Sequence, residues 1–169
     1  NGDCAYLEGI SEDYVAFLRC IQPLREQSIQ IHCTLGNHDH RTNFLNAVIG
    51  PPPPNAERIM NVPDKHVATV TSAQVNWILL DSLDLVNKTP GMLGQPQLTW
   101  IERELRNSPD KPTFVVAIDG DRAAIGSLES DSVGNSSVTL FDASAGWRQS
   151  ASIRASDSAT LRTISQSFL

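Results

Sequence analysis

Apolar and polar positions follow two different periods in the first part of the chain. A helical period begins after Ser11, which predicts a helix with Ser11 as its N-cap, and we expect Pro23 to kink or end it. Its apolar positions are Tyr14, Phe17, Leu18, Ile21 and Leu24. Residues 29–35 then alternate, which predicts a strand that ends at Gly36. A helix followed by a strand is the unit from which parallel sheets are built.

The next elements are separated by turn-forming residues. A short helix is expected over 42–48. The proline run 51–54 ends this helix and is itself expected to be extended. Residues 65–71 and 74–81 alternate like strands and are joined at residues 72–73, which predicts a β-hairpin.

A second long helix is expected after the hairpin. Pro96 suits its first turn, and the helix ends near Asn107. Its apolar stripe is Leu98, Ile101 and Leu105, and Glu102 with Arg106 forms an i,i+4 pair. Residues 113–118 form a strongly apolar strand, so the fold class predicted for the chain is α/β.

The composition changes near residue 118. Beyond it the chain has no Pro, Lys, His, Tyr or Cys and is rich in Ser, Ala and Asp. We therefore divide the chain into residues 1–117 and a Ser/Ala-rich tail, residues 118–169. Short strands are expected at 138–141 and 159–164, and the order of the tail is left open.

Charge and cysteine content limit the classes of function. The net charge of −6 argues against a nucleic-acid patch or a membrane-surface binder, but a small phosphate substrate remains compatible because bound cations reverse the local field. No stretch approaches the length of a membrane span. Cys4, Cys20 and Cys33 are odd in number and widely spaced, which predicts core thiols in a cytoplasmic protein rather than a disulfide framework. Nothing in the pattern predicts an oligomeric state.

The sharpest chemical signal is Gly36-Asn37-His38-Asp39 at the carboxyl end of a predicted strand, where open α/β sheets bind ligands. Asn offers a neutral oxygen to a cation, His can ligate or donate a proton, and Asp can hold that His in one tautomer. Gly2-Asp3 precedes this block by one helix and one strand. Glycine permits a tight turn there, and Asp adds a carboxylate to the same crevice.

These blocks resemble the calcineurin-like metallophosphoesterases. That family carries Asp-x-His, then Gly-Asp, then Gly-Asn-His-Asp/Glu, and later a separate His and Gly-His-x-His. The chain is also similar to the branch that includes cyclic-nucleotide phosphodiesterases, and the similarity spans residues 1–117. The residues that carry this second likeness are Leu79-Leu80-Asp81-Ser82, Gly91-Met92-Leu93, Gln97-Leu98-x-Trp100-Ile101, and Pro112 before the Val-rich strand.

The resemblance implies roles for four residues. Asp3 would bridge two metals, Asn37 would ligate the second metal, His38 would stabilise the transition state or protonate the leaving oxygen, and Asp39 would orient His38. In the complete domain two divalent cations (Mn, Fe, Zn or Mg) hold a hydroxide and clamp the phosphoryl oxygens of a small phosphate mono- or diester. The fold implied is a β-sandwich flanked by helices, of which this chain would hold a part.

Structural readings compete with these roles. Asp3 alone suits a turn or a helix cap, Asn37 suits a left-handed turn, and His38 with Asp39 suits an exposed pair. For the remaining candidates we favour the structural reading. These are an exposed loop residue (His40), strand residues (His32 and His66) and hairpin-end turn residues (Asp81 and Asp84).

Several residues of the family pattern are missing. The Asp-x-His block would precede residue 1, and no histidine follows the strand at 113–118. Asp119 or Asp121 could replace a histidine as an oxygen ligand, but a turn built on Asp-Gly is the simpler reading of these residues. Both metal sites therefore keep part of their ligands, and weak metal binding is expected. One hypothesis is that residues from about 118 onward come from a shifted reading frame or from another replacement of this end.

Three functional readings follow. The chain is a metallophosphoesterase that is incomplete, or an inactive remnant that acts as a binding or interaction module. The third reading, an unrelated α/β binding domain, predicts that Asp3 and Asn37 lie far apart.

Overall fold

The computed structural model describes residues 2–54, 58, 60–107, 111–119, 122–128, 136–142 and 148–155, with side chains described as far as residue 117. The helices are α1 (Ser11–Glu26), α2 (Arg41–Phe44), the π-helical turn η1 (Leu45–Ile49) and α3 (Gly94–Arg106). The strands are β1 (Ala68–Thr71), β2 (Asn76–Leu79), β3 (Thr113–Asp119), β4 (Arg122–Leu128), β5 (Ser136–Asp142) and β6 (Arg148–Ala155). This mixture confirms the predicted α/β class.

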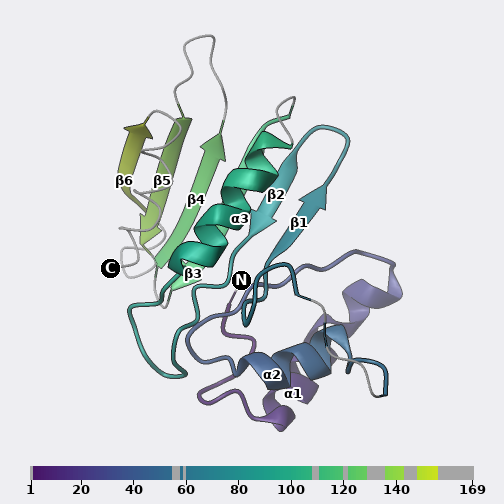
Figure 1. Ribbon diagram of the computed structural model, residues 1–169. Coiled ribbons are helices and arrows are strands. Elements are labelled where there is room, and N and C mark those ends of the chain that lie inside the picture. The colour runs from purple at the N-terminus through teal and green to yellow at the C-terminus, as the bar shows by residue number, and fades with distance from the viewer. Residues whose placement is uncertain are drawn as a thin grey trace.

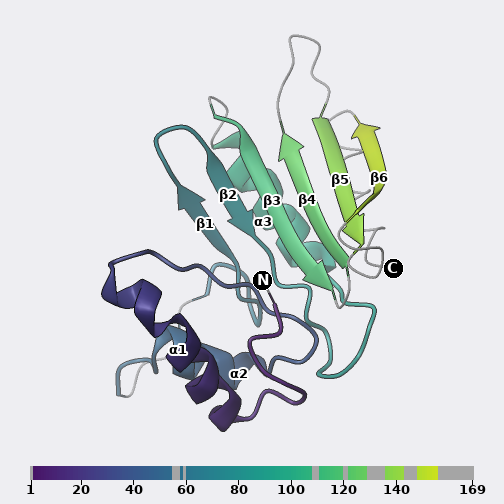
Figure 2. The ribbon, with the colours of Figure 1, turned by 180° about the vertical axis from the view of Figure 1, so that it is seen from behind.

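The described strands form one six-stranded sheet in the order β1-β2-β3-β4-β5-β6. Only β2 and β3 run parallel, and α3 is the crossover between them, as a parallel connection requires. The other neighbours are antiparallel. Helix α3 lies on one face of the sheet, whereas α1 and α2 pack together beyond the end at which β2 and β3 finish (Figures 1 and 2).

Helix α3 covers the sheet with its apolar stripe. Trp100 and Ile101 are buried against the alternate positions of β2 and β3 that point to the same face, such as Ile78 and Val115. The full cluster comprises Val62, Val67, Ile78, Leu80, Leu93, Trp100, Ile101, Val115 and Ala117. Positions between them point to the opposite face, where the rings of Trp77 and Phe114 stack with centroids 4.7 Å apart. Period-2 alternation thus divides both strands between two faces.

A second apolar cluster lies between α1, α2 and three loops near the carboxyl end of β2. It comprises Cys4, Ala5, Tyr14, Leu35, Phe44, Leu45 and Leu83. Its members come from segments remote in sequence, so it holds the N-terminal loop, the Gly-Asn-His-Asp loop and the loop after β2 in fixed relation. This second core is what positions the candidate site.

Two details of α1 differ from the prediction. Ile10, not Ser11, is the N-cap, and Ser11 is the first helical residue. The helix also passes through Pro23 to Glu26. Pro23 and Arg19, whose carbonyl group loses its helical donor to the proline, are both exposed residues, so this position of the helix is accessible to water.

The strand predicted over 29–35 does not form. Residues 30–35 make no main-chain to main-chain hydrogen bond with any other described residue. The burial does not follow the two predicted faces either, because Thr34 is buried and Ile29 is exposed. Alternation alone was not sufficient, since a strand also needs a neighbouring backbone to pair with. The tip of this segment packs on the N-terminal loop, because a Cβ on Gly2 would overlap the main chain of Leu35 and Gly36.

The remaining elements agree with the prediction more closely. The hairpin forms with Thr71 opposite Asn76, the helix expected at 42–48 is realised as α2 followed by η1, and α3 contains Pro96 in its first turn. The strand at 138–141 lies within β5, whereas 159–164 falls outside the described residues. Strand β3 crosses residue 118 without a break, and the division into 1–117 and 118–169 stays a prediction. Among the described helices, none combines the length and apolar character needed to cross a bilayer.

Candidate metal centre

Three loops meet near the carboxyl end of β2. They are residues 2–4, residues 36–39 and the loop 83–92 that leads from β2 to α3. Gly2 and Gly36 let the first two loops touch, because a Cβ on Gly2 would overlap the main chain of Gly36 and a Cβ on Gly36 would overlap Asp3. Any side chain at either position would force the two motif loops apart.

Asp3 reaches the Gly-Asn-His-Asp loop directly. Its backbone is in the left-handed region, with φ of 56°, and its Oδ1 accepts a hydrogen bond of 3.0 Å from the main-chain N–H of His38. No hydrogen bond to its Oδ2 occurs within the part of the chain described here, and the side chain is exposed. Asp3 therefore lies beside the residue that follows Asn37, and not on the far side of the molecule as an unrelated binding domain required.

Asn37 carries a buried oxygen without a partner. Among the described residues nothing donates to its Oδ1, which is shielded from solvent. Its main-chain oxygen is fixed by a 2.7 Å hydrogen bond from the N–H of Asn87. A buried amide oxygen without a hydrogen bond is costly, and a cation ligated there would remove that cost.

His38 is oriented by two acceptors on one ring nitrogen. Its Nδ1 lies 2.6 Å from Oδ1 of Asn87 and 3.2 Å from the main-chain oxygen of Leu7. Because both partners accept, Nδ1 carries the proton, and Nε2 is the atom that gains or loses one. The hydrogen bond to Asn87 is the main cause that raises the pKa of His38, aided by Leu7 and by the negative charge of Asp3, against a smaller opposing effect of burial.

Asp39 is fully buried and joins the two motif loops. Its Oδ2 accepts from the main-chain N–H groups of Gly36 at 2.8 Å and Cys4 at 3.3 Å, and its Oδ1 accepts from the hydroxyl of Tyr14 at 3.2 Å. Burial raises the pKa of Asp39, and the three hydrogen bonds oppose that rise. The prediction that Asp39 holds the His38 ring in one tautomer needs correction, since the contacts that do so belong to Asn87 and Leu7.

Sequence reasoning missed Asn87 and assigned Tyr14 only to the apolar face of α1. Asn87 has φ of 58°, a conformation that asparagine tolerates, but the sequence shows only an asparagine in a loop. The Tyr14 hydroxyl accepts from the N–H of His40 at 2.8 Å while it donates to Asp39. Nothing in the helical period separates such a tyrosine from an ordinary core residue.

Among the other candidate residues, His40 and His66 make structural hydrogen bonds. The exposed His40 accepts from the N–H of Asn43 at 3.4 Å and caps α2. His66 donates from Nε2 to the main-chain oxygen of Cys33 at 3.2 Å, and burial lowers its pKa. His32 and Asp84 are exposed. Asp81 is more than a turn residue, because its buried carboxylate binds Arg41.

The Asp81 carboxylate is the centre of a polar network beneath the site. Arg41 donates from Nε to Oδ2 at 2.7 Å and from a terminal nitrogen to Oδ1 at 3.1 Å. The main-chain N–H groups of His66 and Leu83 donate to the same carboxylate at 2.7 and 3.0 Å. This network fixes the start of the loop that carries Asn87.

Asp3 and Asn37 suit a divalent cation in kind but not in number. An exposed carboxylate and a buried amide oxygen are donors that hard and borderline cations accept. Within the described residues, however, no group of three or more His, Cys, Asp or Glu side chains is arranged to hold a metal ion. Two donors form a partial site, which favours weak binding.

Comparisons with known proteins add no relative. No family model matches the chain. No match was found among curated proteins, and none among solved structures.

Proposed function

We propose that the chain is part of a metal-dependent phosphoesterase that hydrolyses small phosphate mono- or diesters. The supporting observation is the hydrogen bond from the His38 N–H to Asp3 Oδ1, which joins the Gly-Asp loop to the Gly-Asn-His-Asp loop. The unpartnered Oδ1 of Asn37 lies in the same loop. A shared cation site requires these two sets of residues to be close together, and the contact between Asp3 and His38 supports the proposal in that respect.

The residues of the chain would divide the work as follows. Asp3 and Asn37 would supply oxygen ligands to a centre of two divalent cations (Mn, Fe, Zn or Mg). Such a centre would supply a nucleophile and neutralise charge on the phosphoryl oxygens. His38 offers Nε2 as a proton donor to the leaving oxygen, since Nδ1 is committed to Asn87. Asp39 acts through the backbone, because it holds the loops that carry Asp3 and Asn37.

Fold and location belong to the same proposal. The sheet with α3 on one face would be part of a helix-flanked β-sandwich of the metallophosphoesterase type. A small phosphate ester in the cytoplasm is the partner that the acidic composition favours over nucleic acid or a membrane surface.

The test is hydrolysis of p-nitrophenyl phosphate and its bis-ester by the purified chain with added Mn²⁺. We expect slow hydrolysis that a chelator removes and Asp3→Ala abolishes. Asp64→Ala is the matched control, because Asp64 is also an exposed aspartate with a left-handed backbone, φ of 55°. Hydrolysis that persists in Asp3→Ala, or that is insensitive to chelator, would reject the role of this site.

A second candidate is a non-catalytic remnant that acts as a binding or interaction module. The absence of a three-residue metal-ligand cluster among the described residues favours it. It predicts no chelator-sensitive hydrolysis while the chain stays folded by circular dichroism. The two candidates are therefore separated by the same assay.

A further inference from the structure

Two cysteines from distant parts of the sequence meet beside the candidate metal centre. The structure holds Cys4 and Cys33 as thiols, and their side chains are hydrogen bonded to each other. Both belong to the second apolar cluster, Cys4 as a buried member and Cys33 as a partly buried one. Their backbones are held in place on either side of the pair, by the Gly2–Gly36 contact and by the hydrogen bond from Cys4 N–H to Asp39.

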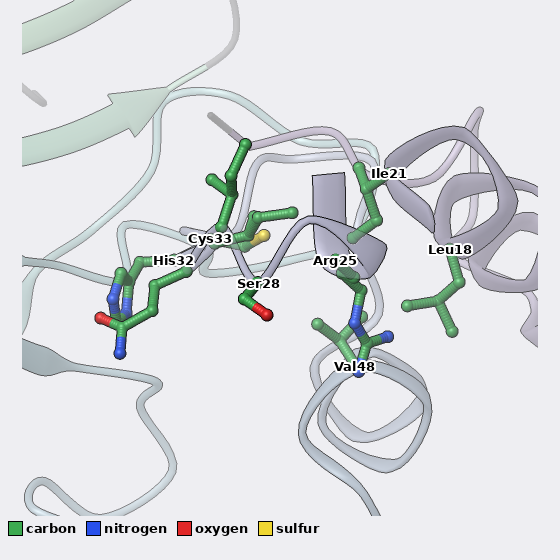
Figure 3. Close-up of a pocket in the computed structure, with 10 residues that line it drawn as sticks. Leu18, Ile21, Arg25, Ser28, His32, Cys33 and Val48 are labelled. Carbon is green, nitrogen blue, oxygen red and sulfur yellow. The ribbon is translucent and has the colours of Figure 1, made fainter. Parts of the chain in front are cut away.

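The two thiols differ in access. Cys33 lines a cavity of about 430 Å³ between α1, the segment 28–33 and η1, and Figure 3 shows its sulfur together with Ser28, Arg25 and Val48 around this space. Cys4 is buried, with 9 % of its surface exposed. A small reagent can therefore reach Cys33 first. The hydrogen bond from the Cys4 thiol lowers the pKa of Cys33 to about 7, and the same contact, together with burial, raises the pKa of Cys4, so Cys33 is the thiol that ionises.

We propose that Cys4 and Cys33 form a redox-active dithiol, which a small-molecule disulfide such as oxidised glutathione converts to an intrachain disulfide. The Cys33 thiolate attacks one sulfur of oxidised glutathione, forms a mixed disulfide and releases one glutathione thiolate. The Cys4 sulfur then attacks Cys33 within the mixed disulfide, the proton of the Cys4 thiol passes to the departing sulfur, and the second glutathione leaves as a thiol. Two protein thiols are oxidised, and one glutathione disulfide is reduced to two thiols.

The disulfide would join the loop that carries Asp3 to the segment that leads into Asn37. It differs from a structural disulfide framework, because the reduced pair is already packed in the core and the bond is reversible. The inference also stands apart from the proposed hydrolysis, since thiol chemistry is measured without metal or phosphate ester.

The experiment equilibrates the full chain with reduced and oxidised glutathione at several ratios, traps thiols by alkylation and maps disulfides by mass spectrometry. The working protein is Cys20→Ser, because Cys20 is exposed on α1 and would form bonds between molecules. We expect a Cys4–Cys33 peptide in this variant and in the native sequence, and full reversal by dithiothreitol.

Single variants test the order of the steps. In Cys4→Ser, combined with Cys20→Ser, Cys33 should stop at a stable mixed disulfide with glutathione. In Cys33→Ser, Cys4 should react with oxidised glutathione at about one tenth of the rate of Cys33 or more slowly, as expected for a buried thiol. A native-sequence protein that accumulates only the mixed disulfide at Cys33, or that joins Cys20 in place of Cys4, would overturn the proposal, and neither result depends on a variant that must fold.

Discussion

Asp3 accepts the main-chain N–H of His38 at 3.0 Å, across 35 positions of sequence. This bond sets the carboxylate beside the loop in which Asn37 keeps a buried oxygen without a partner among the described residues. The pair forms the smallest unit from which a cation site can be built here, and each member can be changed without removing the other.

Metal binding should depend on both residues. We expect Mn²⁺ to raise the melting temperature, and at about ten times its dissociation constant the stabilisation should be about 1.4 kcal/mol. Asp3→Asn keeps an acceptor for His38 and tolerates the left-handed backbone, but it removes the charge, so the Mn²⁺-dependent shift should fall to near zero. Differential scanning fluorimetry measures it, with Asp64→Asn as control. Equal Mn²⁺-dependent shifts in Asp3→Asn and Asp64→Asn would show that Asp3 does not contribute to metal binding.

Asp39 should stabilise the fold mainly as a hydrogen-bond acceptor, and its negative charge should contribute less. Asp39→Ala leaves the N–H groups of Gly36 and Cys4 without an acceptor, at a cost of about 1–3 kcal/mol for each donor. Asp39→Asn keeps one oxygen for these donors, and Tyr14 can then donate to the main-chain oxygen of His40, which lies 3.4 Å away. Urea denaturation should therefore give the alanine variant a clearly lower free energy of unfolding than the asparagine variant.

The same residue makes a prediction about pH. Because burial raises the pKa of Asp39, the folded chain binds this proton more tightly than the unfolded chain. The stability that this proton contributes is complete below about pH 4, the ordinary aspartate value, and is lost as pH rises through the folded pKa. Relative to the native chain, Asp39→Asn should gain stability over that rise, as followed by denaturation at successive pH values. A difference that stays constant with pH would contradict the raised pKa.

The proton affinity of His38 should depend on Asn87. The acceptor on Nδ1 favours the charged imidazolium, which is the stronger donor, so removing it in Asn87→Ala should lower the pKa of His38. NMR titration of the ring measures this in the metal-free chain, and ¹⁵N shifts report whether Nδ1 carries the proton. Asn61→Ala, an exposed asparagine outside the site, is the control. An unchanged pKa in Asn87→Ala would show that Leu7 alone orients the ring.

Local patterns were sufficient for elements whose partners are near in sequence. The β1–β2 hairpin and α3 were predicted because the residues that specify a turn or a helical period are consecutive in the sequence. The segment 29–35 was misread as a strand because its partner lies elsewhere, and alternation specifies two faces but no neighbour. The strands β4 and β6 were missed for a related reason, since Ser- and Ala-rich stretches have weak alternation.

The site was predictable only in part. Asp3, Asn37, His38 and Asp39 were found because they occupy short motifs. Their supports were not, since Asn87, Leu7 and Tyr14 reach the site through a loop and a helix whose sequences show no sign of it. A motif therefore identified the candidate residues, while the contacts that set the tautomer of His38 and the position of Asp39 required coordinates.

The ion pair between Arg41 and Asp81 should contribute strongly to stability, because the Asp81 side chain is fully buried and that of Arg41 is 22 % exposed. Asp81→Ala leaves the guanidinium and the N–H groups of His66 and Leu83 without their acceptor, and breaking a pair of this kind costs about 3 kcal/mol or more. The exposed Glu102–Arg106 pair, 3.7 Å apart on α3, is the comparison, and Glu102→Ala should cost at most about 1 kcal/mol. Urea denaturation of both variants measures the difference.

Since the network also anchors the loop that carries Asn87, Asp81→Ala should alter the His38 ring signals in NMR spectra, whereas Glu102→Ala should leave them in place. Equal stability losses in the two variants would mean that Asp81 contributes no more than a surface charge.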